Sequence, residues 1–125
     1  MGNVRESLQA ALTLDGALAV ALGDWKTGMC LGCAGVDSPE FPLGNLELAV
    51  AGNTEVIRAK LKVSRSLQFS DKIEDILITL SRQYHLIRLT QGIEGLFFYL
   101  VLEREQGNLG MARFKLMQIE QGLVI

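Results

Sequence analysis

LGNLELAVAGNTEVIRAKLKVSRSL, residues 43–67, decides the architecture that we expect for this chain. When these residues are placed on a helix at about 100° per residue, the apolar side is about twice as wide as the stripe of roughly 100° needed for packing on one side. The wide side and its flank hold Leu46, Leu48, Ala49, Val50, Gly52, Asn53, Val56, Ile57, Ala59, Lys60, Leu61, Val63, Ser64 and Leu67. We therefore predict that this helix packs on its own sheet and also on a second copy of the chain.

The composition is that of one globular domain, residues 1–125. Hydrophobic residues make up 49% of the chain and charged residues 21%, which is enough for a real core. The net charge of −2, without a basic stripe, argues against binding of nucleic acid or of an anionic membrane surface. No apolar run approaches the ~20 residues that span a bilayer, and the N-terminus lacks the apolar core of a signal peptide. We expect a cytoplasmic protein with reduced thiols and no membrane insertion.

Helical and strand patterns alternate along the chain in the order α-ββ-α-βββ-α. Asn3 and Glu6 have the spacing of a capping box at the start of the first helix. Asn108 can serve as the N-cap of the last helix, whose apolar residues recur every three or four positions. The strands are expected at residues 17–22, 29–36, 73–80, 84–89 and 96–102.

Two of these strands, residues 17–22 and 96–102, are apolar at every position and must be buried on both faces. They are therefore expected side by side at the centre of one antiparallel sheet with helices on both faces. Short connections then place each remaining strand beside its sequence neighbour, which gives the strand order 2-1-5-4-3. The predicted fold class is α/β in the broad sense, more strictly α+β.

This order leaves the apolar strand IEDILITL, residues 73–80, at an edge of the sheet. An uncovered apolar edge invites aggregation unless it is paired, so we predict a symmetric homodimer that pairs this strand with its copy. A polar residue inside the helical seam, Asn53 or Lys60, can fix the register of the pair or can simply reach solvent at the margin. The predicted interface consists of Ala49, Asn53, Val56, Ile57, Lys60, Ile73, Asp75, Ile76, Leu77, Ile78 and Thr79.

Cys30 and Cys33 form a CxxC motif, the one sequence pattern that suggests metal or redox chemistry. Zinc needs four ligands, whereas the chain has two cysteines and one histidine. A redox CxxC begins a helix, but this one lies in a predicted strand, where the two side chains should point to opposite faces. Two small apolar residues of a strand explain the motif better, although a metal ion shared across a dimer stays open.

No pattern of catalytic residues emerges. His85, the only histidine, lies in a predicted strand and has no recognisable nucleophile motif to serve. Glu74 and Asp75 are adjacent on a strand and face opposite ways. The phosphate-loop spacing is absent around residues 23–28. We therefore predict no catalytic, cofactor-binding or metal-binding residue, and a protein that is not an enzyme.

The polar side of the long helix is most simply a solvated face. If two such helices lie side by side, however, the same side chains form a platform for a partner. The candidate partner-binding residues are Glu47, Thr54, Glu55, Arg58, Lys62 and Arg65.

Three stretches resemble the roadblock / dynein light chain family, particularly its bacterial single-domain members. They are LDGALAVALGDWKTGMCLG (14–32), LELAVAGNTEVIRAKL (46–61) and EDILITLSRQYHLIR (74–88), and the resemblance extends over residues 4–119. It implies a profilin-like sheet and a homodimer continuous across the third strand. It also implies a non-enzymatic role, either binding and regulating a Ras-like small GTPase or scaffolding a signalling or motility complex. The family's GTPase contacts are not a fixed motif, so no contact residue is carried over.

Two other kinds of function compete with this one. Related sheet-and-helix folds bind small molecules between sheet and helix, but Phe97, Phe98 and Tyr99 crowd the central strand and leave little sign of a polar cavity. The second is a redox or metal protein built on Cys30 and Cys33.

Overall fold

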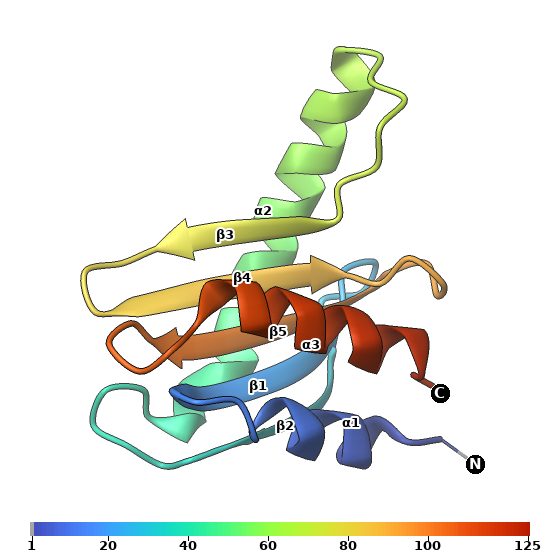
Figure 1. Cartoon of the computed structure of the whole chain (residues 1–125). Helices are drawn as coiled ribbons and strands as arrows, with labels where there is room; N and C mark the ends of the chain where they lie inside the picture. The colour runs from blue at the N-terminus through green and yellow to red at the C-terminus, as the bar shows by residue number, and fades with distance from the viewer. Residues whose placement is uncertain (1) are drawn as a thin grey trace.

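The computed structural model describes residues 2–125, so that only Met1 of the predicted domain lies outside it. Five strands form one antiparallel sheet in the order β2-β1-β5-β4-β3, with α2 on one face and α1 and α3 on the other (Figure 1). This confirms the predicted fold class and strand order. The elements are α1 (Val4–Ala11), β1 (Ala17–Asp24), β2 (Cys30–Gly35), the 3₁₀ turn η1 (Leu43–Asn45), α2 (Leu46–Ser66), β3 (Asp75–Thr79), β4 (Gln83–Leu89), β5 (Leu96–Glu103) and α3 (Leu109–Gln121).

The two central strands are β1 and β5, as their uninterrupted apolar sequences predict. They pair over almost their whole length, for example Ala21 with Tyr99 and Leu22 with Phe98. Every residue of β5 except Glu103 is buried. Successive side chains point to opposite faces of the sheet, so these strands contribute to two separate apolar layers.

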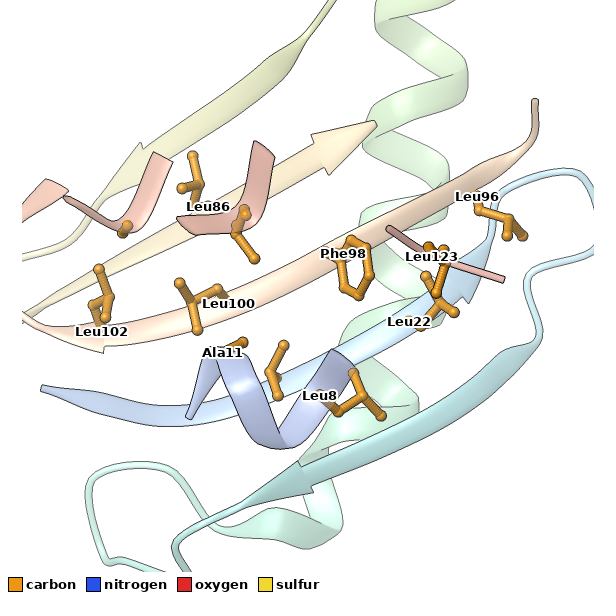
Figure 2. Packing of buried hydrophobic residues seen from close by; sticks show 12 residues of the cluster. Leu8, Ala11, Leu22, Leu86, Leu96, Phe98, Leu100, Leu102 and Leu123 are labelled. Carbon is orange, nitrogen blue, oxygen red and sulfur yellow. The ribbon is translucent and has the colours of Figure 1, made fainter. Parts of the chain in front are cut away.

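The first layer lies between the sheet and the helices α1 and α3. Leu8 and Ala11 of α1 face Leu22, Phe98 and Leu100 of the sheet, as Figure 2 shows. Burial of each leucine or phenylalanine side chain contributes roughly 1.5–3 kcal/mol. This layer fixes the short α1 although an isolated helix of that length is not stable in water.

The second layer lies between the sheet and the first half of α2. The residues of α2 that bury their side chains are Leu46, Val50, Thr54 and Ile57, spaced by three or four positions. The three apolar residues among them pack on Phe97 and other side chains of the sheet. From Arg58 onward no residue of α2 is buried, and this half of the helix extends past β3 (Figure 1). The wide apolar side is thus only partly used within one chain.

The two predicted helix caps have different outcomes. The Asn108 side chain accepts a hydrogen bond from the Met111 amide at 2.9 Å, which confirms it as the N-cap of α3. The capping box at Asn3 is wrong, because the Asn3 side chain makes no cap hydrogen bond. Its Nδ2 donates to the Gly122 carbonyl and its Oδ1 accepts from the Val124 amide, at 2.8 and 2.7 Å. Asn3 therefore ties the two ends of the described chain together.

Strand β2 contains an irregularity that the sequence did not reveal. Gly23 of β1 pairs with Cys30 and Leu22 pairs with Gly32, so Leu31 has no partner and forms a β-bulge. The bulge shifts the alternation of side chains by one position. Cys30 and Cys33 oppose Gly23 and Ala21, which lie two residues apart, and therefore share one face. The expectation that the two thiols point to opposite faces is wrong.

Candidate interaction surface

Strand β3 is an edge strand with a regular backbone, and it pairs only with β4. The Leu80 amide donates to the Gln83 carbonyl, and the Leu89 amide donates to the Glu74 carbonyl. Hydrogen-bonded positions alternate along an antiparallel pair, so the backbone groups of Ile76 and Ile78 also point toward β4. Those of Asp75, Leu77 and Thr79 point away from the sheet and form an open row of donors and acceptors.

The side chains of β3 lie on both faces of this open edge. Ile76 and Ile78 are half-buried beside the layer under α2, and Leu77 packs on the layer under α3. The Asp75 carboxylate receives hydrogen bonds from Nε and one terminal nitrogen of Arg113, at 3.1 and 3.3 Å. The edge is thus apolar on the α2 side and carries an ion pair on the α3 side.

Exposed apolar side chains also occur on α2, from its middle to its C-terminal end, and in the turn that follows it. Val56, Val63, Leu67 and Phe69 are 37%, 47%, 57% and 64% exposed, respectively. Together with Ile76 and Ile78 they define what we call the β3–α2 surface. A monomer rarely leaves a large apolar patch in water unless the patch binds something. The half-buried or exposed predicted interface residues Ala49, Asn53, Lys60 and Ile73 lie on α2 or just before β3.

Two of the predicted surface residues lie inside the chain. Ile57 is fully buried against the sheet, so it cannot touch a second copy. Thr54 is 1% exposed, and its hydroxyl donates to the Val50 carbonyl at 2.9 Å. Because this local hydrogen bond satisfies the hydroxyl, threonine is tolerated on the buried side of the helix. Their assignments to the dimer interface and to the partner-binding surface are corrected accordingly.

Arg58 has a structural role that sequence reasoning missed. Its Nε donates to the Trp25 carbonyl at 2.9 Å, and a terminal nitrogen donates to the Lys26 carbonyl at 2.7 Å. The guanidinium therefore fastens the turn between β1 and β2 to the middle of α2. The remaining predicted partner-binding residues, Glu47, Glu55, Lys62 and Arg65, are exposed.

A polar network lies on the α2 face of the sheet, one strand inside the open edge. The Gln83 side chain donates through Nε2 to the Glu40 carbonyl, so its Oε1 faces His85 Nε2 at 2.8 Å and accepts a hydrogen bond. His85 Nδ1 then accepts from the Tyr99 hydroxyl at 3.0 Å. Burial lowers the pKa of His85. Burial also raises the pKa of Tyr99 to about 12, against the opposing effect of a hydrogen bond with Asn53.

Burial favours the neutral form of His85, and the network uses both of its ring nitrogens. His85 of β4 pairs with Ile78 of β3, so the network lies on the strand directly next to the open edge. Asn53 reaches the same network from α2, which places its side chain toward the sheet.

The remaining features of interest in residues 2–125 are possible metal sites, surface hollows and membrane-spanning helices. Among residues 2–125, no three His, Cys, Asp or Glu side chains are placed together to bind a metal ion. The hollows of the surface, with volumes of about 330–930 Å³, lie at the ends of the sheet and beside α3. None of the helices in the described part of the chain is both long enough and apolar enough to cross a membrane.

Comparison with known proteins identifies the fold. No protein-family model and no curated protein matches the sequence. Solved structures do match: a Roadblock/LC7 domain from Streptomyces avermitilis has a TM-score of 0.76 and 8% identity, covering 93% of this chain and 90% of that one. The gliding protein MglB from Thermus thermophilus has a TM-score of 0.72 and 19% identity, covering 95% and 89%. A structure of MglB with tetrameric arrangement gives 0.72 and 19%, covering 95% and 88%. The chain therefore has the roadblock fold.

Proposed function

We propose that this protein is a cytoplasmic homodimer without enzymatic activity. It binds and regulates a Ras-like small GTPase or scaffolds a signalling or motility complex. The observation that carries the proposal is the β3–α2 surface. It combines an open row of backbone groups on β3 with exposed apolar side chains on a helix that extends past its own sheet. A second copy of the same surface satisfies both features at once.

The register of β3 indicates how two copies pair. The open backbone groups belong to Asp75, Leu77 and Thr79, so a symmetric antiparallel pair can be centred on Leu77 facing Leu77 of the second copy. Asp75 then faces Thr79, which places no like charges opposite each other. The sheet continues across the two chains, and no unpaired apolar edge is left at β3.

The same pairing brings the two α2 helices together. Val56 and Val63 follow each other at helical spacing and extend toward Leu67. Their burial adds about 25 cal/mol for each Å² of apolar surface removed from water. Similarity to a structure of MglB with tetrameric arrangement supports self-association of this fold.

The GTPase partner rests on the resemblance to the roadblock family and on the shared fold with the gliding protein MglB. Paired α2 helices present two copies of a polar strip that includes Glu47, Glu55, Lys62 and Arg65, all exposed. Mixed charges on a rigid helical pair suit recognition of another folded protein, because they set orientation and association rate.

The experiment is a binding titration with purified Ras-like GTPases of the same organism, each loaded with GDP or with a non-hydrolysable GTP analogue. We expect one nucleotide state to bind, and Lys62→Glu to weaken binding by about tenfold, or 1.4 kcal/mol. Arg5→Glu, an equal charge reversal on α1 at the opposite face of the sheet, should have no effect. Binding in neither nucleotide state, or equal losses in both variants, would overturn the proposal.

A further inference from the structure

The CxxC motif gains a chemical meaning from the β-bulge at Leu31. In a regular strand, residues three positions apart face opposite sides of the sheet. Here Leu31 is left out of the pairing, and Cys30 and Cys33 oppose residues of β1 that are two positions apart. The shared face is that of α2, because Cys30 packs on the apolar layer beneath that helix.

The geometry of this pair fits a disulfide that forms and breaks easily. A hydrogen bond between the Cys30 and Cys33 thiols is among the influences on the pKa of Cys30, so the two sulfurs lie next to each other. Neighbouring side chains on one face of a regular strand begin about 6.6 Å apart, whereas a disulfide needs Cβ atoms about 3.5–4.5 Å apart, so closing the bond must distort the bulged strand. A disulfide that distorts its strand is strained and more readily reduced than a structural one. Both cysteines are free thiols in the structure.

The environments of the two thiols differ in a way that suits stepwise oxidation. Cys33 is exposed to solvent, whereas Cys30 is half-buried and its thiol donates to the Gly32 carbonyl at 3.4 Å. Burial raises the pKa of Cys30, which the Gly32 hydrogen bond opposes, while the Cys33 thiol and the Glu47 carboxylate raise it further. The exposed sulfur is thus accessible to a reagent, and the half-buried sulfur lies beside it as the resolving group.

We propose that Cys30 and Cys33 form a reversible intramolecular disulfide by exchange with an oxidised low-molecular-weight thiol. The Cys33 thiolate attacks one sulfur of the reagent disulfide, forms a mixed disulfide and releases the first thiol of the reagent. Cys30 loses its proton to water and attacks Cys33 Sγ, which releases the second. The protein dithiol loses two electrons, and the reagent disulfide gains them. The bond closes across the bulge in β2, on the opposite edge of the sheet from β3, so the site stays accessible in the proposed dimer.

The test uses glutathione disulfide and intact-mass spectrometry after acid quenching. The wild-type chain should become lighter by two hydrogen atoms, and dithiothreitol should restore its original mass. Because the second thiol attacks at a high effective concentration, the mixed disulfide should stay at least about tenfold scarcer than in Cys30→Ser, where no resolving thiol is present.

A relocated cysteine is the matched control. The double variant Cys30→Ala, Ala34→Cys keeps the exposed Cys33 thiol but moves the second thiol to a position opposite Val20, whose side chain lies in the layer under α1 and α3. This variant should accumulate the glutathione adduct. If the wild type accumulates as much adduct as the relocated variant, or forms disulfides between chains in place of the internal one, the proposal is wrong.

Discussion

The two edge strands of the sheet, β2 and β3, differ in regularity and in how closely other elements cover them. At β2 the strand contains Gly32 and Gly35 and a bulge at Leu31, and α1 packs directly over it. A Cβ added to Gly32 would lie 3.1 Å from a methyl group of Leu8 and 3.2 Å from one of Val4. At β3 the sequence DILIT has no glycine, proline or bulge, and its pairing with β4 is regular.

The difference between the edges indicates which of them is built for pairing. Bulges and covering helices are among the devices by which proteins keep an edge from adding another strand. The edge at β2 has both, and the edge at β3 has neither. An apolar, regular and uncovered edge is an aggregation hazard in a monomer, and it is the expected feature of a strand that pairs with its own copy.

The largest expected effect comes from proline placed at neighbouring positions of β3. Ile76→Pro removes an amide that points toward β4 and an apolar side chain that is half-buried, so it should lower the free energy of unfolding by roughly 3 kcal/mol. Leu77→Pro also removes a half-buried side chain, but its amide points outward, where proline is tolerated at an edge, so the loss of stability should be smaller. We expect Leu77→Pro to keep its fold and lose self-association, as measured by chemical denaturation and solution mass. Equal destabilisation by the two prolines would mean that the assigned directions of the backbone groups are wrong.

A methyl group at Gly35 tests how closely the other edge is packed. The new Cβ would lie 2.6 Å from Leu43 and 2.7 Å from the Leu18 carbonyl, a backbone atom that cannot move away easily. Gly35→Ala should therefore destabilise the chain by about 1–3 kcal/mol, the usual cost of overpacking. Its solution mass should equal that of the wild type. A Gly35→Ala variant that changes the oligomeric state would assign a role in pairing to β2.

A smaller effect is expected from a charge on the exposed half of α2. Val63→Asp places a carboxylate among the apolar side chains that the second copy should cover, and it should weaken self-association by about 1.4 kcal/mol, or tenfold. Leu48→Asp, at the opposite end of α2 and also highly exposed, is the matched control and should leave self-association unchanged. Analytical ultracentrifugation over a range of concentrations measures both. Equal weakening by the two variants would contradict the specific role of the overhanging half.

The smallest expected effect is a pH dependence of the free energy of unfolding that arises from His85, on the strand next to β3. Burial lowers the pKa of His85 below its ordinary value, so the unfolded chain takes up a proton at a higher pH than the folded chain does. The contribution of neutral His85 to the free energy of unfolding is complete above the pKa of histidine in the unfolded chain, about 6.5. This contribution declines as the pH falls below that value toward the lower pKa of the folded chain. Since His85 is the only histidine, His85→Gln should remove this decline. Denaturation midpoints between neutral and mildly acidic pH report it, and an unchanged decline in the variant would exclude His85 as its source.

The sequence was sufficient for the fold because its strongest patterns reflect burial. The apolar runs at residues 17–22 and 96–102 identified the two central strands. The connections were short enough to set the neighbours of these strands. The edge position of residues 75–79 followed directly from that order.

What the sequence could not predict depends on partners that are distant along the chain or on local backbone detail. Asn3 fits a helix cap, but its amide finds partners at Gly122 and Val124, more than a hundred residues away. Thr54 has a polar side chain, but its hydroxyl donates a hydrogen bond to the Val50 carbonyl on the preceding turn of α2, so the residue can be buried. The bulge at Leu31 leaves no clear sequence signal beyond its glycine neighbour, yet it decides which face Cys33 occupies.

The most direct test of the account is the solution mass of the wild type and of Ile76→Lys, measured by size-exclusion chromatography with light scattering. We predict twice the mass of one chain for the wild type and the mass of one chain for Ile76→Lys, because burying an unpaired ammonium in the interface costs several kcal/mol. Leu31→Lys, a charge on the opposite edge, should keep the doubled mass, and circular dichroism should show all three proteins folded. A wild type with the mass of one chain, or a folded Ile76→Lys that keeps the doubled mass, would contradict pairing through β3.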